Sequence, residues 1–442
     1  MTKATPKIIV LDDDPTGSQT VHSCLLLTQW DVETLRLGLR DDAPIFFILT
    51  NTRSLPAGEA AQVTREVCQH LKQALAAEQV AEYLVVSRSD STLRGHYPVE
   101  TDVIAQELGP FDAHFLTPAF FEGGRFTRDS IHYLMVDGIP TPVHETEFAQ
   151  DSVFGYRFSY LPDYVAQKTQ GRIAPDQVER FLLSEIRQGC LDRLMQLQGN
   201  PCAAVDAETQ SDLDRFAQDL LTAAGRGKKF LFRSAASLLT ALAQLPPQPV
   251  APEKMATYVR QGKPGAFIVG SHVRKTTEQL RALLAVAGVR GIELDLEQMR
   301  ADSTATAKLR EAAIAQVQQV FEAGQTPVVY TSRQELSFAD EETRLAFGSQ
   351  VSALLMDIVR ALPSEIGYLV SKGGITSNDV LSQGLALPTA RLLGQIIPGC
   401  SVVRTPTNHP QFPNLPVVLF PGNVGSVDSL VTVLQRFSNP PG

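Results

Sequence analysis

Short apolar runs alternate with longer amphipathic stretches over most of the chain. Residues 7–11, 45–50, 82–87 and 113–117 are apolar runs bounded by turn residues, which is the pattern of strands buried on both faces. Residues 56–78 lie between the second and third runs and repeat their apolar side chains at helical spacing. This strand–helix–strand order predicts a parallel sheet with helices on its faces.

The same order restarts after a proline-rich segment. Residues 243–264 contain five prolines and little apolar periodicity, which is typical of a linker. Beyond it the pattern predicts strands at 266–270, 291–294, 327–331, 366–371, 400–404 and 416–420, and helices at 275–287, 304–323, 341–361 and 376–384. We therefore expect an α/β protein of two tandem α/β domains whose mainly parallel sheets face each other across a cleft. The expected bounds are 1–242 for the first domain, 243–264 for the linker and 265–442 for the second domain.

The later part of the first domain is less regular. Residues 138–165 are polar and aromatic without a period, which favours a long functional excursion. Helical patterns at 175–195 and 210–225 flank a short strand near 202–205, and another strand follows at 229–233.

Composition excludes several classes of partner. The formal net charge of -9 disfavours a general role at nucleic acid or at an anionic membrane. No apolar stretch reaches membrane-spanning length, and the N-terminus lacks a signal-peptide pattern. The five cysteines are scattered without a C-x-x-C pair, as expected for reduced thiols. We expect a cytoplasmic protein with small-molecule partners that forms a homodimer, the common assembly of cytosolic enzymes.

Three carboxylates follow the first predicted strand. Asp12, Asp13 and Asp14 come directly after the apolar run, Pro15 stops the strand, and Gly17 permits a tight turn. Adjacent carboxylates repel one another, so a strand end that holds them needs a compensating cation. Because ligands of open α/β sheets gather beyond the carboxyl ends of the strands, this segment predicts an active-site edge. The alternative is a solvated acidic turn.

Arginines follow the next predicted strands of the first domain. Arg53, Arg94 and Arg125 each come shortly after a strand, where guanidinium groups suit bidentate capture of a carboxylate or phosphate. The alternative is that Arg53 and Arg94 only neutralise nearby aspartates. The turn after the strand 82–87 also carries Asp90, Ser91 and Gly95.

Three histidines lie near these turns, namely His22, His96 and His132. Each has the chemistry of an acid–base group, but we favour a capping or buried structural role for all three.

Three small-residue turns mark the second domain. The segment SKGGITSND at 371–379 leaves a strand and enters a helix, with Thr376, Ser377 or Asn378 available to cap it. The turn Gly270-Ser271 and the turn from Pro421 to Ser426 also lie between a strand and a helix. Helix N-termini favour phosphate, so three such turns predict a nucleotide site, with Lys372 adding positive charge. No ligand set for a metal ion is readable.

These junctions, in this order, resemble the four-carbon acid sugar kinase family. The family has a D-D-x-T-G turn, a D-S-T-x-R-G turn, a P-A-x-x-x-x-G-R segment, a G-S turn, a G-G-x-T turn and a closing G-N-x-G. In this chain they read Asp13 to Gly17, Asp90 to Gly95, Pro118 to Arg125, Gly270-Ser271, Gly373 to Thr376 and Gly422 to Gly425. Members commonly have Lys-Ser before the closing motif, where this chain has Phe420-Pro421.

The resemblance implies an N-terminal substrate-binding domain and a C-terminal nucleotide-binding domain. It implies ATP-dependent phosphorylation, with Mg²⁺, of a terminal hydroxyl on a sugar acid such as threonate, erythronate or a 3-oxo-tetronate. Asp13 and Asp14 would orient the acceptor hydroxyl, and one of them would accept its proton. The implied substrate-binding residues are Thr16, Gly17, Arg53, Asp90, Ser91, Arg94, Gly95 and Arg125. The implied ATP-binding residues are Ser271, Lys372, Gly373, Gly374, Ile375, Thr376, Gly422, Asn423 and Gly425.

Two other functions stay open from the sequence. The run from Leu11 to Thr16 also fits the strand-then-D-x-D-x-T pattern of aspartate-nucleophile phosphatases of the haloacid dehalogenase type, with Thr50 as the second motif. The acidic pair that such an enzyme needs at a later strand end is not found. The third possibility is a non-catalytic sugar-acid sensor, against which the paired carboxylates and the phosphate-type turns argue.

Overall fold

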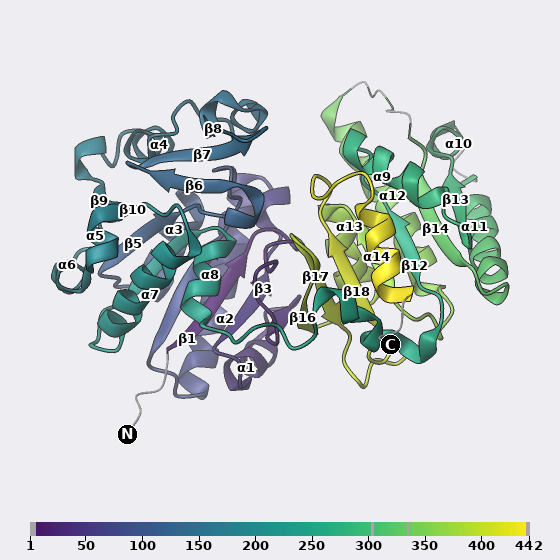
Figure 1. Cartoon of the computed structure of the whole chain (residues 1–442), viewed down its shortest axis with the longest axis horizontal. Coiled ribbons are helices and arrows are strands. Elements are labelled where there is room, and N and C mark those ends of the chain that lie inside the picture. The colour runs from purple at the N-terminus through teal and green to yellow at the C-terminus, as the bar shows by residue number, and fades with distance from the viewer. Residues whose placement is uncertain (1–5, 302–304, 334–335, 337, 339, 439–442) are drawn as a thin grey trace. The chain divides into compact units, whose positions relative to one another are not determined.

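The computed structural model describes residues 6–301, 305–333, 336, 338 and 340–438. Their contacts divide the chain into a first unit, Met1–Pro247, and a second unit, Gln248–Gly442. Both are α/β structures, which confirms the predicted fold class (Figure 1).

The first unit is built on a parallel sheet. Among the described residues its strand order is β2-β3-β1-β4-β11-β5-β10-β9, and each neighbouring pair is parallel. The strands are β1 (Lys7–Asp12), β2 (Leu25–Leu27), β3 (Ile45–Leu49), β4 (Tyr83–Arg88), β5 (Ala113–Thr117), β9 (Glu179–Phe181), β10 (Cys202–Val205) and β11 (Phe230–Ser234). Strands buried on both faces explain the continuous apolar runs of the sequence.

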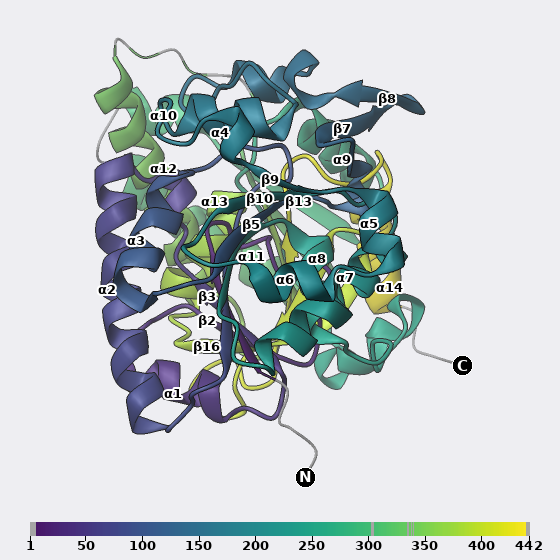
Figure 2. The same ribbon diagram turned by 90° about the vertical axis from the view of Figure 1, so that its left-hand side faces the viewer.

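Helices cover both faces of this sheet, as Figure 2 shows for α2 and α3 on one side and α6 and α7 on the other. On one face Ile9 and Leu11 of β1 pack with Val67 and Leu71 of α2 and with Ile104 of α3. On the other face Phe115 of β5 contacts the ring of Phe216 from α7. The helices are α1 (Val32–Arg40), α2 (Ala57–Ala77), α3 (Val99–Leu108), α4 (Leu161–Lys168), α5 (Leu183–Gln188), α6 (Leu191–Gln196), α7 (Gln210–Ala224) and α8 (Ala236–Ala243).

Residues 125–168 form a small folded layer. An antiparallel sheet of β6 (Arg125–Arg128), β7 (Ile131–Val136) and β8 (Ile139–Pro142) is followed by 3-10 turns and by α4. The predicted irregular excursion is therefore wrong in part, because its aromatic residues pack internally. The helical pattern predicted at 175–195 is confirmed in part: α5 and nearly all of α6 lie within it, but Gly189, at φ 112°, separates them and β9 precedes them.

The second unit has a mixed sheet. Its strand order among the described residues is β13-β14-β12-β15-β18-β17-β16. The pairs β18–β17 and β17–β16 are antiparallel, and the other neighbouring pairs are parallel. The strands are β12 (Ala266–Val269), β13 (Val289–Leu294), β14 (Thr326–Thr331), β15 (Leu369–Lys372), β16 (Thr389–Ile397), β17 (Cys400–Arg404) and β18 (Pro416–Phe420). The helices are α9 (Arg274–Leu284), α10 (Leu296–Ala301), α11 (Ala305–Glu322), α12 (Glu341–Arg360), α13 (Gly374–Asp379) and α14 (Ser429–Ser438).

Each sheet has a point where the chain switches sides. In the first unit β3 lies on one side of β1 and β4 on the other. In the second unit β14 lies on one side of β12 and β15 on the other. A crevice forms beyond the carboxyl ends of strands at such a point, and ligands of open α/β sheets bind there. The acidic segment follows β1, the turn Gly270-Ser271 follows β12, and the double-glycine turn follows β15, which pairs with β12.

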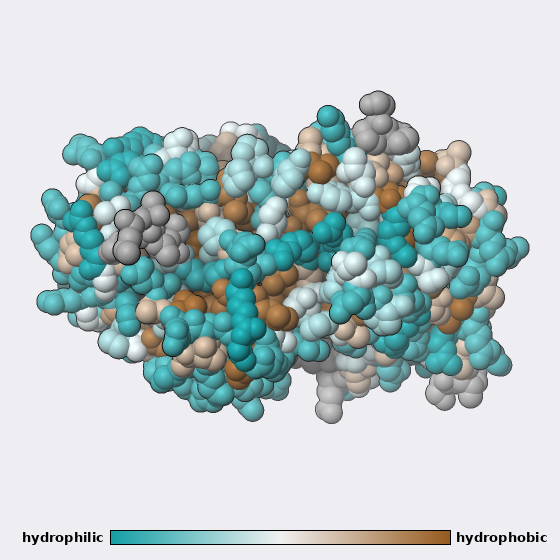
Figure 3. All heavy atoms as spheres, turned by 90° about the horizontal axis from the view of Figure 1, so that it is seen from below, coloured by the Kyte–Doolittle hydropathy of each residue, from teal (hydrophilic) through white to brown (hydrophobic). Residues whose placement is uncertain are grey.

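The face shown in Figure 3 is mainly hydrophilic. Among the helices of the described ranges, none is both long enough and apolar enough to cross a bilayer.

Candidate active site

Asp13 lies at the carboxyl end of β1 and is held from two sides. Its Oδ1 accepts a hydrogen bond from Arg53 Nη2 at 3.0 Å, and its Oδ2 accepts one from Ser89 Oγ at 2.6 Å. The carboxylate is buried, with 2% of its surface exposed. Burial raises the pKa of Asp13, although Arg53 opposes the rise. A fixed carboxylate with a raised pKa is suited to accept a proton.

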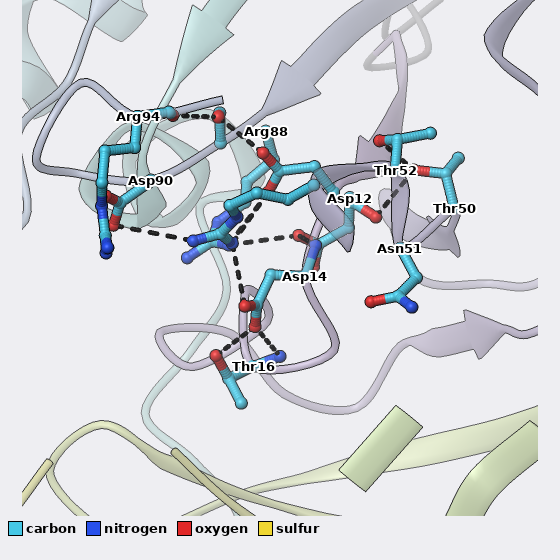
Figure 4. A network of polar contacts seen from close by, with 12 residues as sticks. Asp12, Asp14, Thr16, Thr50, Asn51, Thr52, Arg88, Asp90 and Arg94 are labelled. Atoms are coloured by element: carbon cyan, nitrogen blue, oxygen red, sulfur yellow. Dashed lines mark hydrogen bonds and ion pairs between the residues drawn. The ribbon is translucent and has the colours of Figure 1, made fainter. Parts of the chain in front are cut away.

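Asp14 differs from Asp13 in its hydrogen-bond partners and in the direction of its pKa shift. Its Oδ1 accepts from the main-chain N of Thr16 at 2.7 Å and from the Thr16 hydroxyl, and its Oδ2 pairs with Arg53 at 3.0 Å (Figure 4). Burial works against ionisation, but Arg53 and Arg88 hold the pKa of Asp14 below its usual value. Asp14 therefore stays a carboxylate anion that neutralises Arg53.

Asp12 lies beneath the site and is fully buried. Its Oδ1 pairs with Arg88 at 3.3 Å, while Oδ2 has no hydrogen-bond partner among the described residues. Burial raises the pKa of Asp12 to about 7, against the effect of Arg88. A Cβ on Gly17 would lie 2.1 Å from Asp12 Oδ1, so Gly17 is required for the loop to pack over this carboxyl group. Gly17 thus has a packing role in the structure.

The turn at 90–95 carries a second ion pair. Arg94 Nε donates to Asp90 Oδ2 at 2.7 Å, and Arg53 lies 3.8 Å from Asp90 Oδ1 (Figure 4). Burial raises the pKa of Asp90, but the charges of Arg94 and Arg53 lower it by more than burial raises it. The pKa of Asp90 therefore lies below its usual range. Gly95, at φ 118°, adopts a conformation that favours glycine. Arg53 and Arg94 therefore both form ion pairs with aspartates in the structure.

Three side chains of the folded layer form hydrogen bonds with the main-chain carbonyls of three consecutive residues of this turn. His132 Nε2 lies 2.8 Å from the carbonyl of Ser91, Tyr156 donates to Thr92 at 2.7 Å, and Tyr164 donates to Leu93 at 2.8 Å. Leu93 has φ 66°, an uncommon conformation for a non-glycine residue. We call these three side chains the carbonyl clamp. The irregular aromatic segment of the sequence thus shapes the turn that carries Asp90 and Arg94.

Arg125 has a different environment from the other predicted arginines. It is partly exposed, and its Nη1 donates to the carbonyl of Gly123 at 2.5 Å. Its Nε has no partner, and it forms no ion pair with a carboxylate of the described residues. Burial lowers the pKa of Arg125. Of the three predicted arginines, Arg53 and Arg94 pair with aspartates, and Arg125 is the one without a carboxylate partner among the described residues.

The histidines near these turns are structural, as expected. His22 Nε2 lies 2.7 Å from the carbonyl of Pro246, and His96 Nε2 lies 2.9 Å from that of Leu55. His132 is fully buried, and burial lowers its pKa to about 4.

In the second unit the three predicted turns meet. Ser271 N donates to the carbonyl of Lys372 at 3.2 Å, and Gly373 N donates to that of Phe420 at 2.8 Å. Thr276 Oγ1 bridges Ser271 Oγ and the carbonyl of Gly422, each at 3.1 Å. The predicted residues Ser271, Lys372, Gly373 and Gly422 are therefore close together.

Glycine makes this convergence possible. A Cβ on Gly270 would lie 2.2 Å from Thr376 Oγ1, which places Thr376 beside the first turn. Gly374 begins α13, and the expectation that Thr376, Ser377 or Asn378 caps this helix is wrong, because Gly373 occupies the N-cap position. Three other predicted residues lie at the edge: Ile375 is 67% exposed, and Asn423 and Gly425 are exposed in the closing turn.

Lys372, which the sequence predicted to add positive charge at this site, is fully buried. Its Nζ donates to the carbonyls of Pro421 at 2.6 Å and Gly422 at 3.2 Å, and lies 4.0 Å from the ring centre of Phe420. Burial lowers the pKa of Lys372 to about 7. Lys372 therefore holds the closing turn against β15.

Comparisons with known families match both units. Residues 8–242 match the family described as a sugar-binding N-terminal domain, and residues 266–430 match the family described as a nucleotide-binding C-terminal domain. The chain belongs to this two-domain family. The resemblance noted from the sequence motifs is thereby confirmed.

Relatives of this sugar-binding and nucleotide-binding family include named kinases. A D-erythronate kinase from Heliobacterium modesticaldum is 23% identical over 467 residues, which cover 98% of this chain and 98% of that protein. A D-threonate kinase from Bordetella bronchiseptica is 29% identical over 166 residues, which cover 36% of this chain and 38% of that protein.

Two solved structures share the family fold. A Salmonella typhimurium protein provisionally described as a tRNA synthase matches with a TM-score of 0.71 and 20% identity, covering 98% of this chain and 100% of its own. A Haemophilus influenzae protein matches with a TM-score of 0.63 and 19% identity, covering 97% and 100%. At these identities the likeness shows the fold alone.

The residues of the nucleotide-binding unit fit a polyphosphate. The described groups that gather at its turns are the hydroxyls of Ser271 and Thr276 and the guanidinium of Arg333. Arg333 Nη2 donates to the carbonyl of Ser271 at 2.7 Å, and its Nη1 has no hydrogen-bond partner among the described residues. The described residues contain no cluster of three or more acidic, histidine or cysteine side chains suited to a metal ion. Mg²⁺ in kinases is usually bound by one or two carboxylates together with the substrate phosphates and water.

Sequence motifs missed several residues of the site. Arg88 is the last residue of β4, Ser89 follows it directly, and Arg333 lies two residues after β14. Each is a polar residue at the end of an apolar strand, which is a signal that the sequence offered. Their partners across the sheet were not readable from it.

Proposed function

We propose that this protein is an ATP-dependent kinase that phosphorylates a terminal hydroxyl of a four-carbon sugar acid of the threonate, erythronate or 3-oxo-tetronate type. Family membership supports a sugar-binding and a nucleotide-binding unit. The D-erythronate kinase that aligns over nearly the whole chain supports the substrate class.

One observation carries the proposal. Asp13 is a buried carboxylate with a raised pKa, fixed by Arg53 and Ser89 at the switch point of the sugar-binding unit. A general base must be positioned by its neighbours and must not be fully neutralised by a cation. Asp13 meets both conditions better than Asp14, whose pKa is lowered. We therefore assign the proton acceptor role to Asp13 and a charge-balancing role to Asp14.

The proposed reaction is an in-line phosphoryl transfer. The acceptor hydroxyl oxygen bonds to the γ-phosphorus of ATP, the bond from that phosphorus to the β–γ bridging oxygen breaks, and ADP leaves. Asp13 takes the hydroxyl proton. Mg²⁺, when bound with the nucleotide, supplies charge neutralisation on its phosphates. Because the transfer is direct, the proposal requires the two units to bring their substrates together during turnover.

Arg125 is the residue that we propose for the carboxylate of the sugar acid. Its guanidinium has donors left for a planar anion, whereas Arg53 and Arg94 are paired with aspartates. Asp90 and Ser91 would contact the hydroxyl groups of the substrate. Ser271, Gly373, Thr376, Gly422 and Arg333 would surround the phosphates of ATP, and Lys372 would hold the closing turn for them.

The phosphatase alternative conflicts with the structure. Its nucleophile would be Asp12, which is fully buried and paired with Arg88. Its second motif, Thr50, donates its hydroxyl to the main-chain carbonyl of Asp12 at 3.0 Å. A nucleophile must reach the phosphorus of its substrate, so Asp12 is unsuited to this role.

A coupled ADP-release assay tests the proposal. Four-carbon sugar acids are screened with ATP and Mg²⁺, using the wild-type chain, Asp13→Asn, and Thr64→Val as a control for loss of a buried hydroxyl elsewhere. Thr64 lies in α2 and donates its hydroxyl hydrogen to the carbonyl of Ala60 at 2.7 Å. We expect turnover with at least one acid, a loss of about 10²–10⁴-fold in Asp13→Asn, and wild-type rates in Thr64→Val. Full activity in a folded Asp13→Asn variant would refute the assignment.

A further inference from the structure

Arg233 is a charged residue inside a buried strand. It lies in β11 with 4% of its surface exposed. Its Nη1 donates to Glu100 Oε2 at 2.5 Å and to Ser87 Oγ at 2.8 Å, and its Nη2 donates to Ser89 Oγ at 2.6 Å. Desolvating such a group is costly, and a buried ion pair is weak evidence for stability by itself. The position of Arg233 therefore invites a functional explanation.

The contact with Arg233 decides what the Ser89 hydroxyl can do. A serine hydroxyl has one hydrogen and two lone pairs. Because Arg233 donates to the oxygen, that oxygen acts as an acceptor on this side, and its single hydrogen is left for another partner. Asp13 Oδ2 at 2.6 Å is closer than the carbonyl of Arg94 at 3.0 Å, and it is charged, so it is the stronger acceptor. Arg233 thus directs the Ser89 hydrogen at Asp13.

Glu100 completes the arrangement from α3. It is 4% exposed, and its Oε1 accepts a hydrogen bond from Thr52 Oγ1 at 2.6 Å. Its Oε2 pairs with Arg233 at 2.5 Å. Both carboxylate oxygens are therefore occupied, and the guanidinium is held in one orientation by a neighbour of opposite charge.

Gly95 provides the space for these contacts. A Cβ at this position would lie 2.4 Å from Ser89 Oγ and 2.6 Å from Arg233 Nη2. The glycine of the second sequence motif thus lets the turn approach Ser89 and Arg233 closely.

We infer that Arg233, Ser89 and Glu100 are positioning residues that orient the Asp13 carboxylate and tune its protonation. This inference rests on the proposed function in one respect, namely that Asp13 is the proton acceptor. None of the three needs to contact a substrate. Arg233 acts through Ser89, and Glu100 limits the positive charge that Arg233 imposes on Asp13.

The charged groups around Asp13 determine in which direction each variant should shift its pKa. Charged groups face it from β1 and its loop, from the turn after β3, from β4, from α3 and from β11. They are Asp12, Asp14, Arg53, Arg88, Glu100 and Arg233. The Ser89 hydrogen bond favours the ionised form of Asp13, whereas the negative charge of Glu100 disfavours it.

Two near-isosteric variants therefore shift Asp13 in opposite directions. Ser89→Ala removes a hydrogen bond from the carboxylate and is expected to raise the pKa of Asp13 by about one unit. Glu100→Gln removes a negative charge, leaves Arg233 uncompensated, and is expected to lower it. Thr64→Val again serves as the control. A residue with a merely structural role would change the fraction of folded protein without moving the pKa of Asp13.

Two measurements test the inference on the full chain. The first is carboxyl ¹³C NMR titration of protein labelled at aspartate, with the Asp13 signal assigned by its loss in Asp13→Asn. The second is the acidic limb of kcat/KM against pH for ADP release. We expect the limb and the NMR titration to move up together in Ser89→Ala and down together in Glu100→Gln, with an unchanged KM for ATP.

Each possible failure is distinguishable. If both variants fold and the Asp13 signal titrates as in the wild-type chain, the positioning inference is overturned. If the NMR titration shifts as expected but no four-carbon acid supports ADP release, the positioning inference holds and the proposed function fails. Should one variant not fold, the other still gives a shift of predicted sign.

Discussion

The hydroxyl of Tyr156 donates a hydrogen bond of 2.7 Å to the main-chain carbonyl of Thr92. This bond belongs to the carbonyl clamp, in which His132, Tyr156 and Tyr164 hold three consecutive carbonyls of the turn that presents Asp90 and Arg94. Side chains from the segment 132–164 therefore fix the conformation of the turn at 91–93, which precedes them by about 40 to 70 residues. Because Leu93 has a positive φ within this turn, its conformation depends on contacts from outside it.

Removal of one clamp hydroxyl is expected to affect the sugar acid selectively. Tyr156→Phe leaves the carbonyl of Thr92 without its donor inside the protein, at a cost of about 1–3 kcal/mol in stability. We expect kcat/KM for the acid to fall about tenfold, with an unchanged KM for ATP, in steady-state kinetics. Tyr133→Phe is the matched control, since Tyr133 stacks on Phe126 through its ring, with centroids 5.3 Å apart. Equal effects of the two variants would contradict a role for the clamp.

Gly17 is expected to tolerate no side chain. The Cβ of Gly17→Ala would lie 2.1 Å from Asp12 Oδ1, inside a fully buried site, so the loop or the carboxyl group must move. Such overpacking typically costs about 1–3 kcal/mol. We expect a lower Tm and a large loss of activity. Gly58→Ala is the control, because nothing lies within 4 Å of its Cβ on α2, and we expect its Tm to be unchanged or raised.

The clamp should also make the first unit sensitive to acid. The pKa of His132 is lowered by burial from 6.5 to about 4, so the folded chain holds the neutral ring while the unfolded chain takes up a proton at higher pH. The stability that His132 contributes is present above pH 6.5 and is lost as the pH falls toward 4, by about 3 kcal/mol. Denaturant unfolding of the wild-type chain should show this loss, and His132→Gln should show a smaller one. An identical pH dependence in both would contradict it.

The sequence predicted the strands well because buried parallel strands read as continuous apolar runs. β1, β3, β4 and β5 lie where those runs predicted them, the acidic segment follows β1, and the double-glycine turn follows β15. The nine-residue strand β16 was missed, since its alternating and partly polar pattern lacked such a run.

The sequence motifs predicted which residues lie at the site, but they did not predict the contacts between those residues. Asp13, Arg53 and Asp90 were visible because each follows a strand. Arg233 and Glu100 were not, because their importance arises from hydrogen bonds between β11 and α3, which no local pattern encodes. The roles of Arg94 and Lys372 also depended on partners: an aspartate for the first, and main-chain carbonyls for the second.

Arg125 is expected to determine the affinity for the sugar acid. In Arg125→Gln the guanidinium is lost while a polar side chain remains beside Gly123. Since a charge-assisted hydrogen bond to a ligand is worth about 1.5–3 kcal/mol, we expect the KM for the acid to rise roughly 10–100-fold, with an unchanged KM for ATP. Arg226→Gln, at an exposed position after α7, is the control. An unchanged KM for the acid in Arg125→Gln would show that another cation binds the carboxylate.

The most direct test of the account is ³¹P NMR of the wild-type chain with ATP, Mg²⁺ and the sugar acid that releases ADP fastest. We predict a phosphate monoester signal on the acid that grows in step with ADP, and no such signal with Asp13→Asn. Release of inorganic phosphate without a monoester, or no reaction with any four-carbon sugar acid, would contradict the assignment of this chain as a sugar-acid kinase.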